Sequence, residues 1–532
     1  MNYRLSEYLL LTVFCWLFSY SLVYGQSWKL TADNIAGALE NASEKIKGDP
    51  LRPAFHLTPP AGCMGDPNGG IYHNGWYHIF YGLQPFSGDF GGWYWAHAKT
   101  RDFLDWQHLP PGLTPAFQFG LNAVGSGSTV LTEEGKTLAF YSSSINDTMA
   151  FWRAEMSADL NTWRHTEKNP VVTLQQSGLP DYDVFFRDPF VFRAGGRTLM
   201  IACADLFDEN YVSVPVFEAK NPDFTDWEYK GILFTWPKHE FRNFEVPEIH
   251  PLGDKWVFLA SCDAPVDRTL YLIGEFDPEI LRFMPRSQGF LDYSGHYYAQ
   301  EAVQDDQGNL FLMAWIPGWD RPWMPNFRPS DRKNRKELWN GCFALPRKLS
   351  IDSEGTLIQQ PVISLKHLRS QPVAVESRQL PVVNAAAAID VLKNVRGNQL
   401  ELQAEFELGA ASFCGLNVLC DDHGNGGMTI MWSGDMINID GVQVPMPEWT
   451  PGQPLHLRIF IDKQIVEVFI NGGVHCVSRQ VQIDYIKGDR IALTRLGGHA
   501  VLKSLKAWTL KSLDSFSQPV TNADTKPRMK IY

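Results

Sequence analysis

The most informative absence from this 532-residue chain is an excess of positive charge. Its 47 lysines and arginines are outnumbered by 59 aspartates and glutamates, which gives a formal net charge of −12. Nucleic acids and anionic membrane surfaces are bound through positively charged faces. The composition therefore argues against nucleic acid or a membrane surface as a partner and favours a neutral ligand.

Beyond its N-terminus the chain has no apolar run long enough to cross a bilayer. The one long run, Tyr8 to Tyr24, follows Arg4 and ends just before Gly25, which is the layout of a cleaved secretory signal at residues 1–25. A retained membrane anchor is the alternative, and the shortness of the run disfavours it. We expect a secreted or periplasmic protein with no membrane insertion after signal cleavage, and we leave its oligomeric state open.

Cysteine is also scarce. Of the eight cysteines, Cys15 lies in the predicted signal, and the other seven are odd in number and include no Cys-x-x-Cys pair. This pattern fits neither a dense disulfide framework nor a zinc site. Cys414 and Cys420 could pair, or all seven could be buried free thiols. We expect no metal and no cofactor.

What the chain does contain is a repeat. Five segments share a polar turn, an apolar strand, a tight turn with glycine and a second apolar strand, and their turn glycines recur at intervals of 55 to 61 residues. Repeats of this size built from short strands are typical of propellers with four-stranded blades. Five repeats predict five blades. The turn glycines are Gly75, Gly135, Gly196, Gly253 and Gly308.

The domain organisation follows from these patterns. Residues 26–50 form an N-terminal extension with one amphipathic helix, and residues 51–350 form the propeller, which we expect to be the catalytic domain. A linker at 351–379 leads to residues 380–511, where apolar and polar residues alternate as in an antiparallel sandwich. Residues 512–532 are a tail. The predicted fold class is all-β, a five-bladed β-propeller followed by a C-terminal β-sandwich.

The repeat also predicts which side chains meet. Residues eight or nine positions before each turn glycine are expected at equivalent places on the innermost strands, at the mouth of the central channel. Three of the five are carboxylates, and like charges held together repel each other, so a purely structural role explains them poorly. The five residues are Asp66, Gly127, Asp188, Glu245 and Gln300.

Aromatic residues near the same mouth favour a carbohydrate as the ligand, because the C–H faces of sugars pack on aromatic rings and their hydroxyls bond to acids. Hydrolysis of a glycoside would use one carboxylate as the nucleophile and a second, kept protonated, as the acid. A separation of about 5 to 5.5 Å between them gives retention of configuration. The aromatic residues are Trp93, Tyr94, Trp95, Trp152, Trp315 and Trp319.

Five stretches of the sequence resemble one known family. They read CMGDPNGG, FRDPF, FEVPEI, WNGCFALPRKL and LRIFIDKQIVEVFINGG, in this order along the chain. Together they resemble glycoside hydrolase family 32, the invertase, inulinase and levanase group, over nearly the whole mature chain. The resemblance implies a propeller followed by a sandwich, and retaining hydrolysis of β-fructofuranosides such as sucrose, levan or inulin.

The resemblance also implies roles for single residues. Asp66 matches the nucleophile, Glu245 the general acid/base, and Asp188 the residue that binds fructosyl hydroxyls and steadies the transition state. Glu248, three residues past Glu245, is the rival acid. The positive charge of Arg187 is expected to favour an ionised carboxylate beside it. The predicted substrate-binding residues are Asn68, Trp95, Ser126, Arg187, Gln300 and Trp315.

The chain departs from the family pattern where the sugar would be held. Gly65 replaces an Asn of the family pattern, Gly82 replaces a Gln, and Gly125 replaces a Phe. Phe90 replaces a Trp, and Val246 replaces a Cys. Each lost contact is worth about 0.5 to 1.5 kcal/mol. Trp93 and Tyr94 are expected to compensate by stacking.

Four hypotheses follow. The first is a secreted retaining hydrolase of β-fructofuranosides, inactivated by Asp66→Asn or Glu245→Gln. The second is the same chemistry on another furanoside, favoured by the glycine replacements. The third is a non-catalytic carbohydrate-binding protein, whose binding would survive loss of Asp66. The fourth is fructosyl transfer, in which a sugar in place of water accepts the glycosyl group.

Overall fold

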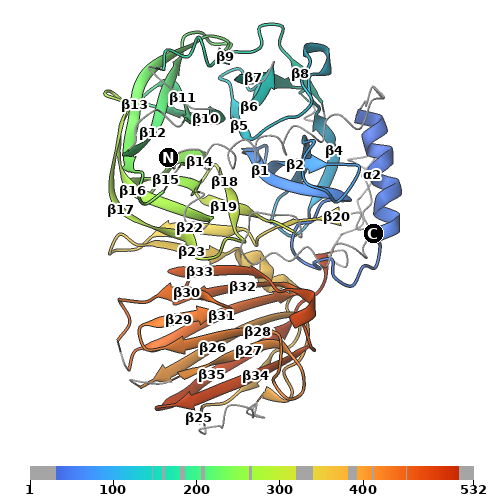
Figure 1. The fold of residues 1–532 in the computed structure, drawn as a ribbon, viewed down its shortest axis with the longest axis vertical. Helices are drawn as coiled ribbons and strands as arrows, with labels where there is room; N and C mark the ends of the chain where they lie inside the picture. Colours follow the sequence, from blue (N-terminus) through green and yellow to red (C-terminus); the bar gives the residue numbers. More distant parts are fainter. Residues whose placement is uncertain are drawn as a thin grey trace, which may run out of the picture.

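The computed structural model describes residues 32–145, 148–158, 162–179, 186–204, 210–241, 243–262, 267–318, 339–380, 392–409, 413–450 and 452–513. The predicted signal peptide, Trp319 and most of the predicted tail lie outside these residues. The described chain is all-β, as predicted, with a single α-helix among the described residues (Figure 1).

That helix is α2 (Ala32–Ile46), which confirms the predicted amphipathic helix. Ile35, Leu39 and Ile46 recur at helical spacing and are buried, and the helix contacts the outer strand β4 (Gln107–Leu113). Within the described residues, no helix combines the length and the apolar character that a membrane crossing requires.

Residues 62–361 form five sheets (Figure 1). The first has the order β20 (Trp339–Asn340), β1 (Gly62–His73), β2 (Trp76–Gln84), β3 (Tyr94–Thr100) and β4. The second has the order β5 (Gly127–Leu131), β6 (Thr137–Ile145), β7 (Thr148–Met156) and β8 (Trp163–His165), with β9 (Val172–Thr173) on β7. The third is β10 (Arg187–Ala194), β11 (Arg197–Cys203), β12 (Tyr211–Ala219) and β13 (Trp227–Pro237). The fourth is β14 (Glu245–Leu252), β15 (Lys255–Cys262), β16 (Arg268–Asp277) and β17 (Arg282–Asp292). The fifth is β18 (Tyr298–Gln304), β19 (Leu310–Ile316), β22 (Arg347–Ile351) and β23 (Leu357–Pro361), with β21 (Cys342–Phe343) on β19.

The first strands of the five sheets lie next to one another in a ring. β1 contacts β5 and β18, β10 contacts β5 and β14, and β14 contacts β18, so the order around the ring is the order along the chain (Figure 1). Each of the five predicted turn glycines lies between the first two strands of its sheet and has a positive φ, which a side chain would oppose. The repeat therefore marks the start of each sheet, and the ring brings one end of all five first strands together.

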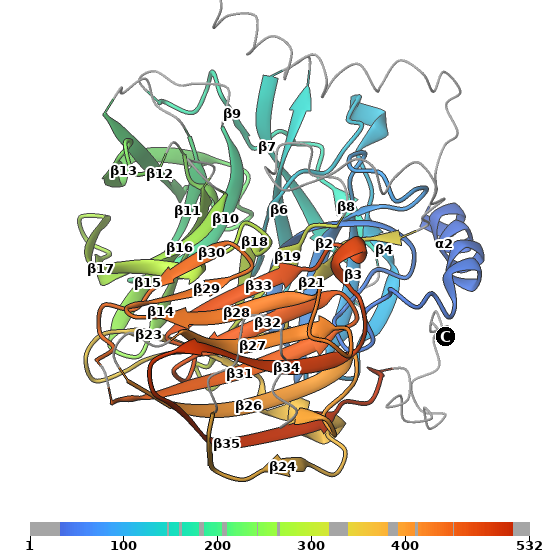
Figure 2. The same ribbon diagram turned by 60° about the horizontal axis from the view of Figure 1, so that its bottom comes forward.

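The second part of the chain contains two sheets over one core (Figure 2). The larger sheet contains β24 (Val373–Val375), β25 (Arg378–Gln379), β26 (Gln399–Leu408), β31 (Pro454–Asp462), β32 (Ile465–Ile470), β33 (His475–Gln480) and β35 (Ala500–Thr509). The smaller contains β27 (Phe413–Cys420), β28 (Met428–Ser433), β29 (Met436–Ile439), β30 (Val442–Pro445) and β34 (Arg490–Gly497). Side chains such as Leu402, Leu416 and Ile459 meet in the core between them. Short 3₁₀ turns lie at Phe117–Phe119, Ile363–Leu368 and Ile483–Tyr485.

The cysteines of the described chain are all buried free thiols, seven in number. Cys414 and Cys420 both lie in β27 and do not pair. Of the two expectations for these cysteines, a Cys414–Cys420 disulfide and buried free thiols, the structure therefore agrees with the second.

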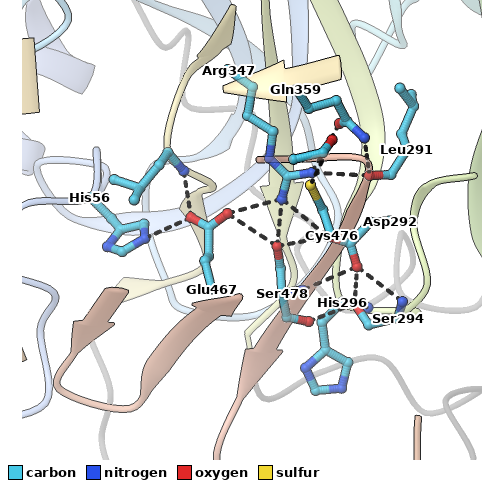
Figure 3. Close-up of polar contacts among 12 residues, drawn as sticks. His56, Leu291, Asp292, Ser294, His296, Arg347, Gln359, Glu467, Cys476 and Ser478 are labelled. Atoms are coloured by element: carbon cyan, nitrogen blue, oxygen red, sulfur yellow. Dashed lines mark hydrogen bonds and ion pairs between the residues drawn. The ribbon is translucent and has the colours of Figure 1, made fainter. Parts of the chain in front are cut away.

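Two carboxylates beside the β31–β32 turn bind the segment that precedes β1. Asp462 accepts hydrogen bonds from the backbone N–H groups of Ala54, Phe55 and His56 at 2.7, 2.8 and 3.1 Å. The imidazole of His56 lies between the two carboxylates, with Nδ1 2.8 Å from Asp462. Its Nε2 lies 3.0 Å from Glu467 (Figure 3). Because both ring nitrogens face carboxylate oxygens, this geometry favours the doubly protonated ring.

Arg347 of β22 lies at the centre of the same buried cluster (Figure 3). Its guanidinium donates to Glu467 at 2.9 Å, to Asp292 at 3.0 Å and to the Ser478 hydroxyl at 2.8 Å. It also lies 4.0 Å from the centre of the Tyr297 ring. Arg347 and both carboxylates are fully buried, so this cluster joins the fifth sheet to the second part of the chain through charges that have no access to water.

We expect the stability of the protein to depend on pH through His56. Burial opposes the charged ring, but the hydrogen bonds to Asp462 and Glu467 outweigh it and raise the pKa of His56 from 6.5 to about 9. A folded-state pKa above the unfolded value means that the stabilisation is complete below pH 6.5 and is lost as the pH rises through 9. It amounts to about 3 kcal/mol at most. Urea unfolding between pH 6 and 10 measures it.

A matched pair of variants isolates the contribution of this ring. His56→Gln is expected to lower the free energy of unfolding at pH 6.5 and to flatten its fall between pH 6.5 and 9. His423→Gln removes an exposed histidine from the second part of the chain and leaves the profile unchanged. A His56→Gln profile as steep as that of the wild type would contradict the assignment.

Candidate active site

Four of the five strands in the ring break their register near the start of the strand. The breaks lie between Met64 and Pro67 in β1, between Arg187 and Phe190 in β10, between Glu245 and Glu248 in β14, and between Tyr298 and Glu301 in β18. A β-bulge of this kind bends the strand and re-aims its side chains. All three predicted catalytic carboxylates lie within or directly beside such a bulge.

The bulges hold the backbone in a strained conformation. Asp188, Val246 and Ala299 have φ values of 57°, 44° and 48°. A positive φ is uncommon for any residue with a side chain, and it is a genuine outlier for a β-branched residue such as Val246. Strain of this kind is concentrated at functional sites.

Asp66 is fixed in the β1 bulge by polar contacts to the next strand of the ring. The Ser126 hydroxyl donates to Oδ2 of Asp66 at 2.7 Å. Asn68 donates from its amide to the Asp66 carbonyl at 2.8 Å and accepts from the N–H of Gly127 at 3.0 Å. The carboxylate of Asp66 is therefore oriented by Ser126, while Asn68, which is buried, holds the backbone of the bulge.

Glu245 lies between a cation and a phenol. Arg187 donates to its Oε1, and the Tyr298 hydroxyl lies 2.5 Å from its Oε2. Nε of Arg187 lies 3.7 Å from the carboxylate of Asp188. One arginine therefore connects two of the three predicted catalytic acids.

The pKa of Asp188 depends on the charges of both Asp66 and Glu245. The side chain of Asp188 is almost completely buried, and it accepts a hydrogen bond from the N–H of Val246 at 3.1 Å. Burial, together with the negative charges of Glu245 and Asp66, raises the pKa of Asp188 to about 6, against the opposing charge of Arg187 and the hydrogen bond from Val246. The structure thus brings Asp66, Asp188 and Glu245 into one electrostatic site.

Three of the predicted substrate-binding residues lie behind this site. Trp95 is fully buried and donates to the Gly125 carbonyl at 3.0 Å. Gln300 is fully buried between the Ser261 hydroxyl and the Val246 carbonyl, at 2.9 Å from each. Trp315 is 3% exposed and packs parallel to Phe90. In this structure these three side chains support the walls of the site, whereas Ser126 and Arg187 contact its carboxylates directly.

The rival acid Glu248 is enclosed deeper in the ring. It is buried, its carboxylate contacts His250 at 2.8 Å and the N–H of Ala302 at 2.9 Å, and Glu301 lies close to it. Burial raises the pKa of Glu248 well above its usual range. Its contacts link β14 to β18 and do not involve the three predicted catalytic acids, so the geometry favours Glu245 over Glu248.

One part of the predicted strand alignment was wrong. Counting back from the turn glycines placed Gln300 level with Glu245, but the bulges place Tyr298 level with Glu245 and with Arg187. The reason is that Gly253 is the first residue of its turn and Gly196 the second, while the turn after β18 is longer. Tyr298 was missed for this reason, although its position in YYAQEA would have exposed it once the bulge was known.

Arg187 connects Asp188 and Glu245, Tyr298 contacts Glu245, and Asp66 lies close enough to act on Asp188. Carboxylates brought together in this way are what glycosidases use to protonate a leaving oxygen and attack an anomeric carbon.

Comparison with known proteins agrees with that class. The model of the glycosyl hydrolases family 32 N-terminal domain matches residues 56–361, and that of the family 32 C-terminal domain matches residues 364–509. The chain belongs to glycosyl hydrolase family 32. It is a glycosidase that acts on O-glycosyl compounds.

Relatives and solved structures cover nearly the whole chain. A raffinose invertase of Escherichia coli is 30% identical over 500 residues, 89% of this chain and 98% of the relative. A sucrose-6-phosphate hydrolase of Zymomonas mobilis is 28% identical over 523 residues, 90% and 96% of the two chains. The structure of fructan 1-exohydrolase IIa from Cichorium intybus shares the fold with a TM-score of 0.73 at 21% identity, over 87% and 98% of the two chains.

Proposed function

We propose that the protein is an exported retaining glycosidase that hydrolyses β-fructofuranosides of the sucrose, levan or inulin type through a covalent glycosyl-enzyme intermediate. The observation that carries this proposal is the single electrostatic site of Asp66, Asp188 and Glu245, with Arg187 between the last two. The relatives named above, an invertase and a sucrose-6-phosphate hydrolase, support the choice of substrate class.

In the proposed reaction Asp66 attacks the anomeric carbon of the fructosyl unit. The hydrogen bond from Ser126 to Oδ2 orients this carboxylate for the attack. Glu245 protonates the oxygen of the leaving group, and in the second half of the reaction it takes a proton from the water that releases the sugar. Asp188 binds the sugar hydroxyls and stabilises the positive charge that develops on the ring in the transition state.

We also propose that the five sheets form a five-bladed β-propeller and that the two sheets of the second part form a β-sandwich. The ring of first strands and the likeness to family 32 structures support this architecture. The catalytic site then lies at the mouth of the propeller channel, where the four bulges meet. We retain 51–350, 351–379 and 380–511 as the catalytic domain, linker and sandwich.

Export rests on the N-terminal pattern alone, since residues 1–25 lie outside the described chain. A signal peptide there would deliver the protein to the periplasm or to the medium. Detection of the activity in that fraction, and loss of residues 1–25 from the purified protein by mass spectrometry, would test this part of the proposal.

The proposed function is tested by incubating the purified protein with sucrose, inulin, levan and a panel of other furanosides, and by identifying the released sugar. Release of fructose from one of the first three, first seen by NMR as the β-anomer, is the expected result. Activity only on another furanoside would select the second hypothesis, which the position of Trp93 beside Gly65 and Gly82 favours. Binding without turnover of any of these compounds would overturn the proposal.

A further inference from the structure

Two glycines of the first sheet make room for one indole ring. Trp93 belongs to the loop between β2 and β3, and its ring lies over Gly65 of β1 and Gly82 of β2. A Cβ atom on Gly65 would lie 3.1 Å from both Cη2 and Cζ3 of the indole, and one on Gly82 would lie 3.4 Å from Cε3. Neither glycine has a positive φ, so the backbone does not require glycine at these places. The ring accounts for the absence of a side chain at Gly65.

The ring of Trp93 is held in place by its own loop and by neighbouring segments of the chain. The ring of Phe90 meets it edge to face, with centroids 4.9 Å apart, and packs parallel to Trp315 on its other side. The Trp93 carbonyl accepts from the N–H of Val124 at 2.9 Å. Gln84 holds the loop through a hydrogen bond to the Gly91 carbonyl at 2.9 Å. A ring fixed in this way needs little ordering when a ligand binds against it.

This position borders the proposed nucleophile. Gly65 directly precedes Asp66, and a Cβ atom on Gly82 would lie only 3.6 Å from the backbone nitrogen of Asp66. Trp93 is half-buried and Phe90 is 37% exposed, so the aromatic pair keeps open surface. On this side of Asp66 the chain offers aromatic surface that is only partly buried, and the two glycines beneath the indole offer no side-chain hydrogen bonds.

We propose that Trp93 determines the sugar specificity of the active site, as a wall against which the C–H face of the furanosyl ring packs. This inference rests on the proposed function, because it assumes that the sugar ring binds at Asp66. A furanosyl ring with an unsubstituted C–H face is favoured there. A ring that carries a charged or branching group on that face is rejected, because the group would lose its water without gaining a hydrogen bond.

Kinetics on sucrose and on the furanoside panel test the proposal with graded variants. Trp93→Ala is expected to raise KM for the best substrate about tenfold or more, with a smaller effect on kcat, and to narrow its kcat/KM advantage over the poorer substrates by a similar factor. Trp93→Phe keeps a smaller aromatic face and should show a weaker form of the same effect. Gly65→Ala, whose methyl group would displace the ring, should change the ranking of substrates in the same direction.

Two control variants separate this effect from general damage. Trp76→Ala removes another half-buried tryptophan of the same sheet, which lies under Lys99 and Arg101 and far along the strand from Asp66. Gly37→Ala makes the same change as Gly65→Ala on helix α2, where an added Cβ atom would have no heavy atom within 4 Å. Both should keep KM and substrate ranking within about twofold of the wild type. Wild-type KM values and ranking in both Trp93 variants, or an equal change in Trp76→Ala, would overturn the proposal.

The same panel distinguishes failure of the proposed function from failure of this inference. If the wild type hydrolyses none of the compounds, the proposed function fails, and titration with each sugar then decides the inference by tryptophan fluorescence. A sugar that changes the emission of the wild type but not that of Trp93→Phe supports the wall. If no sugar changes the emission, or if Trp93→Phe responds like the wild type, the wall is refuted as well.

Discussion

Asp66→Asn is expected to lower kcat on any furanoside that the wild type hydrolyses by about four orders of magnitude or more. The amide cannot form the covalent bond to the anomeric carbon, and loss of a nucleophile removes a step that the remaining residues cannot replace. The fold should persist, because an amide oxygen can still accept the hydrogen bond from Ser126 that the carboxylate accepts at 2.7 Å. Initial rates of sugar release and a thermal unfolding curve measure both effects.

Asp254→Asn is the matched control for this prediction. It makes the same chemical change at a carboxylate that is 89% exposed, in the turn between β14 and β15. Its rate should equal that of the wild type. An Asp66→Asn variant that retains more than about a hundredth of the wild-type kcat would remove Asp66 from the role of nucleophile.

Arg347→Ala is expected to cost about 3 to 5 kcal/mol of unfolding free energy. The substitution leaves the carboxylates of Asp292 and Glu467 fully buried without the cation between them, and it removes the cation that lies over the Tyr297 ring. Breaking one side of a buried ion cluster is costly because Asp292 loses the cation beside it and Glu467 keeps only His56 as a cation, while neither carboxylate gains access to water. Urea unfolding at pH 7, followed by tryptophan fluorescence, measures the change.

Arg286→Ala provides the comparison for a surface pair. Arg286 is 66% exposed and lies 3.6 Å from Glu275, which is half exposed, so its loss should change the unfolding free energy by less than about 1 kcal/mol. Equal effects of the two substitutions would mean that water enters the Arg347 cluster, and the buried network would then lose its stabilising role.

Much of the first part of the fold could be predicted, because its cause is local. The turn glycines have the positive φ that tight turns require, and their regular spacing repeats along the chain, so Gly75 and Gly253 could be recognised without knowledge of the structure. The gathering of Asp66, Asp188 and Glu245 followed from the same repeat, since equivalent strands in a ring place equivalent ends together.

The remaining features depend on contacts that no local pattern records. The turn after β18 is longer than the turn after β14, and this difference makes Tyr298, not Gln300, the neighbour of Glu245. The packing of the Trp93 ring against Gly65 is equally non-local, because the two residues are 28 positions apart in the sequence. Glycine at position 65 is visible in the sequence, but the ring that requires it is not.

The hydrogen bond from Ala54 to Asp462 spans 408 positions of the chain. During synthesis, the segment around His56 and the strand that holds Arg347 are complete long before the ribosome reaches the hairpin that carries Asp462 and Glu467. A nascent chain must therefore keep these cations hydrated until the β31–β32 hairpin arrives. It also follows that a truncated protein ending near residue 361, or a chimera whose second part lacks this pair of acids, would leave His56 without either carboxylate and Arg347 with Asp292 as its remaining acid.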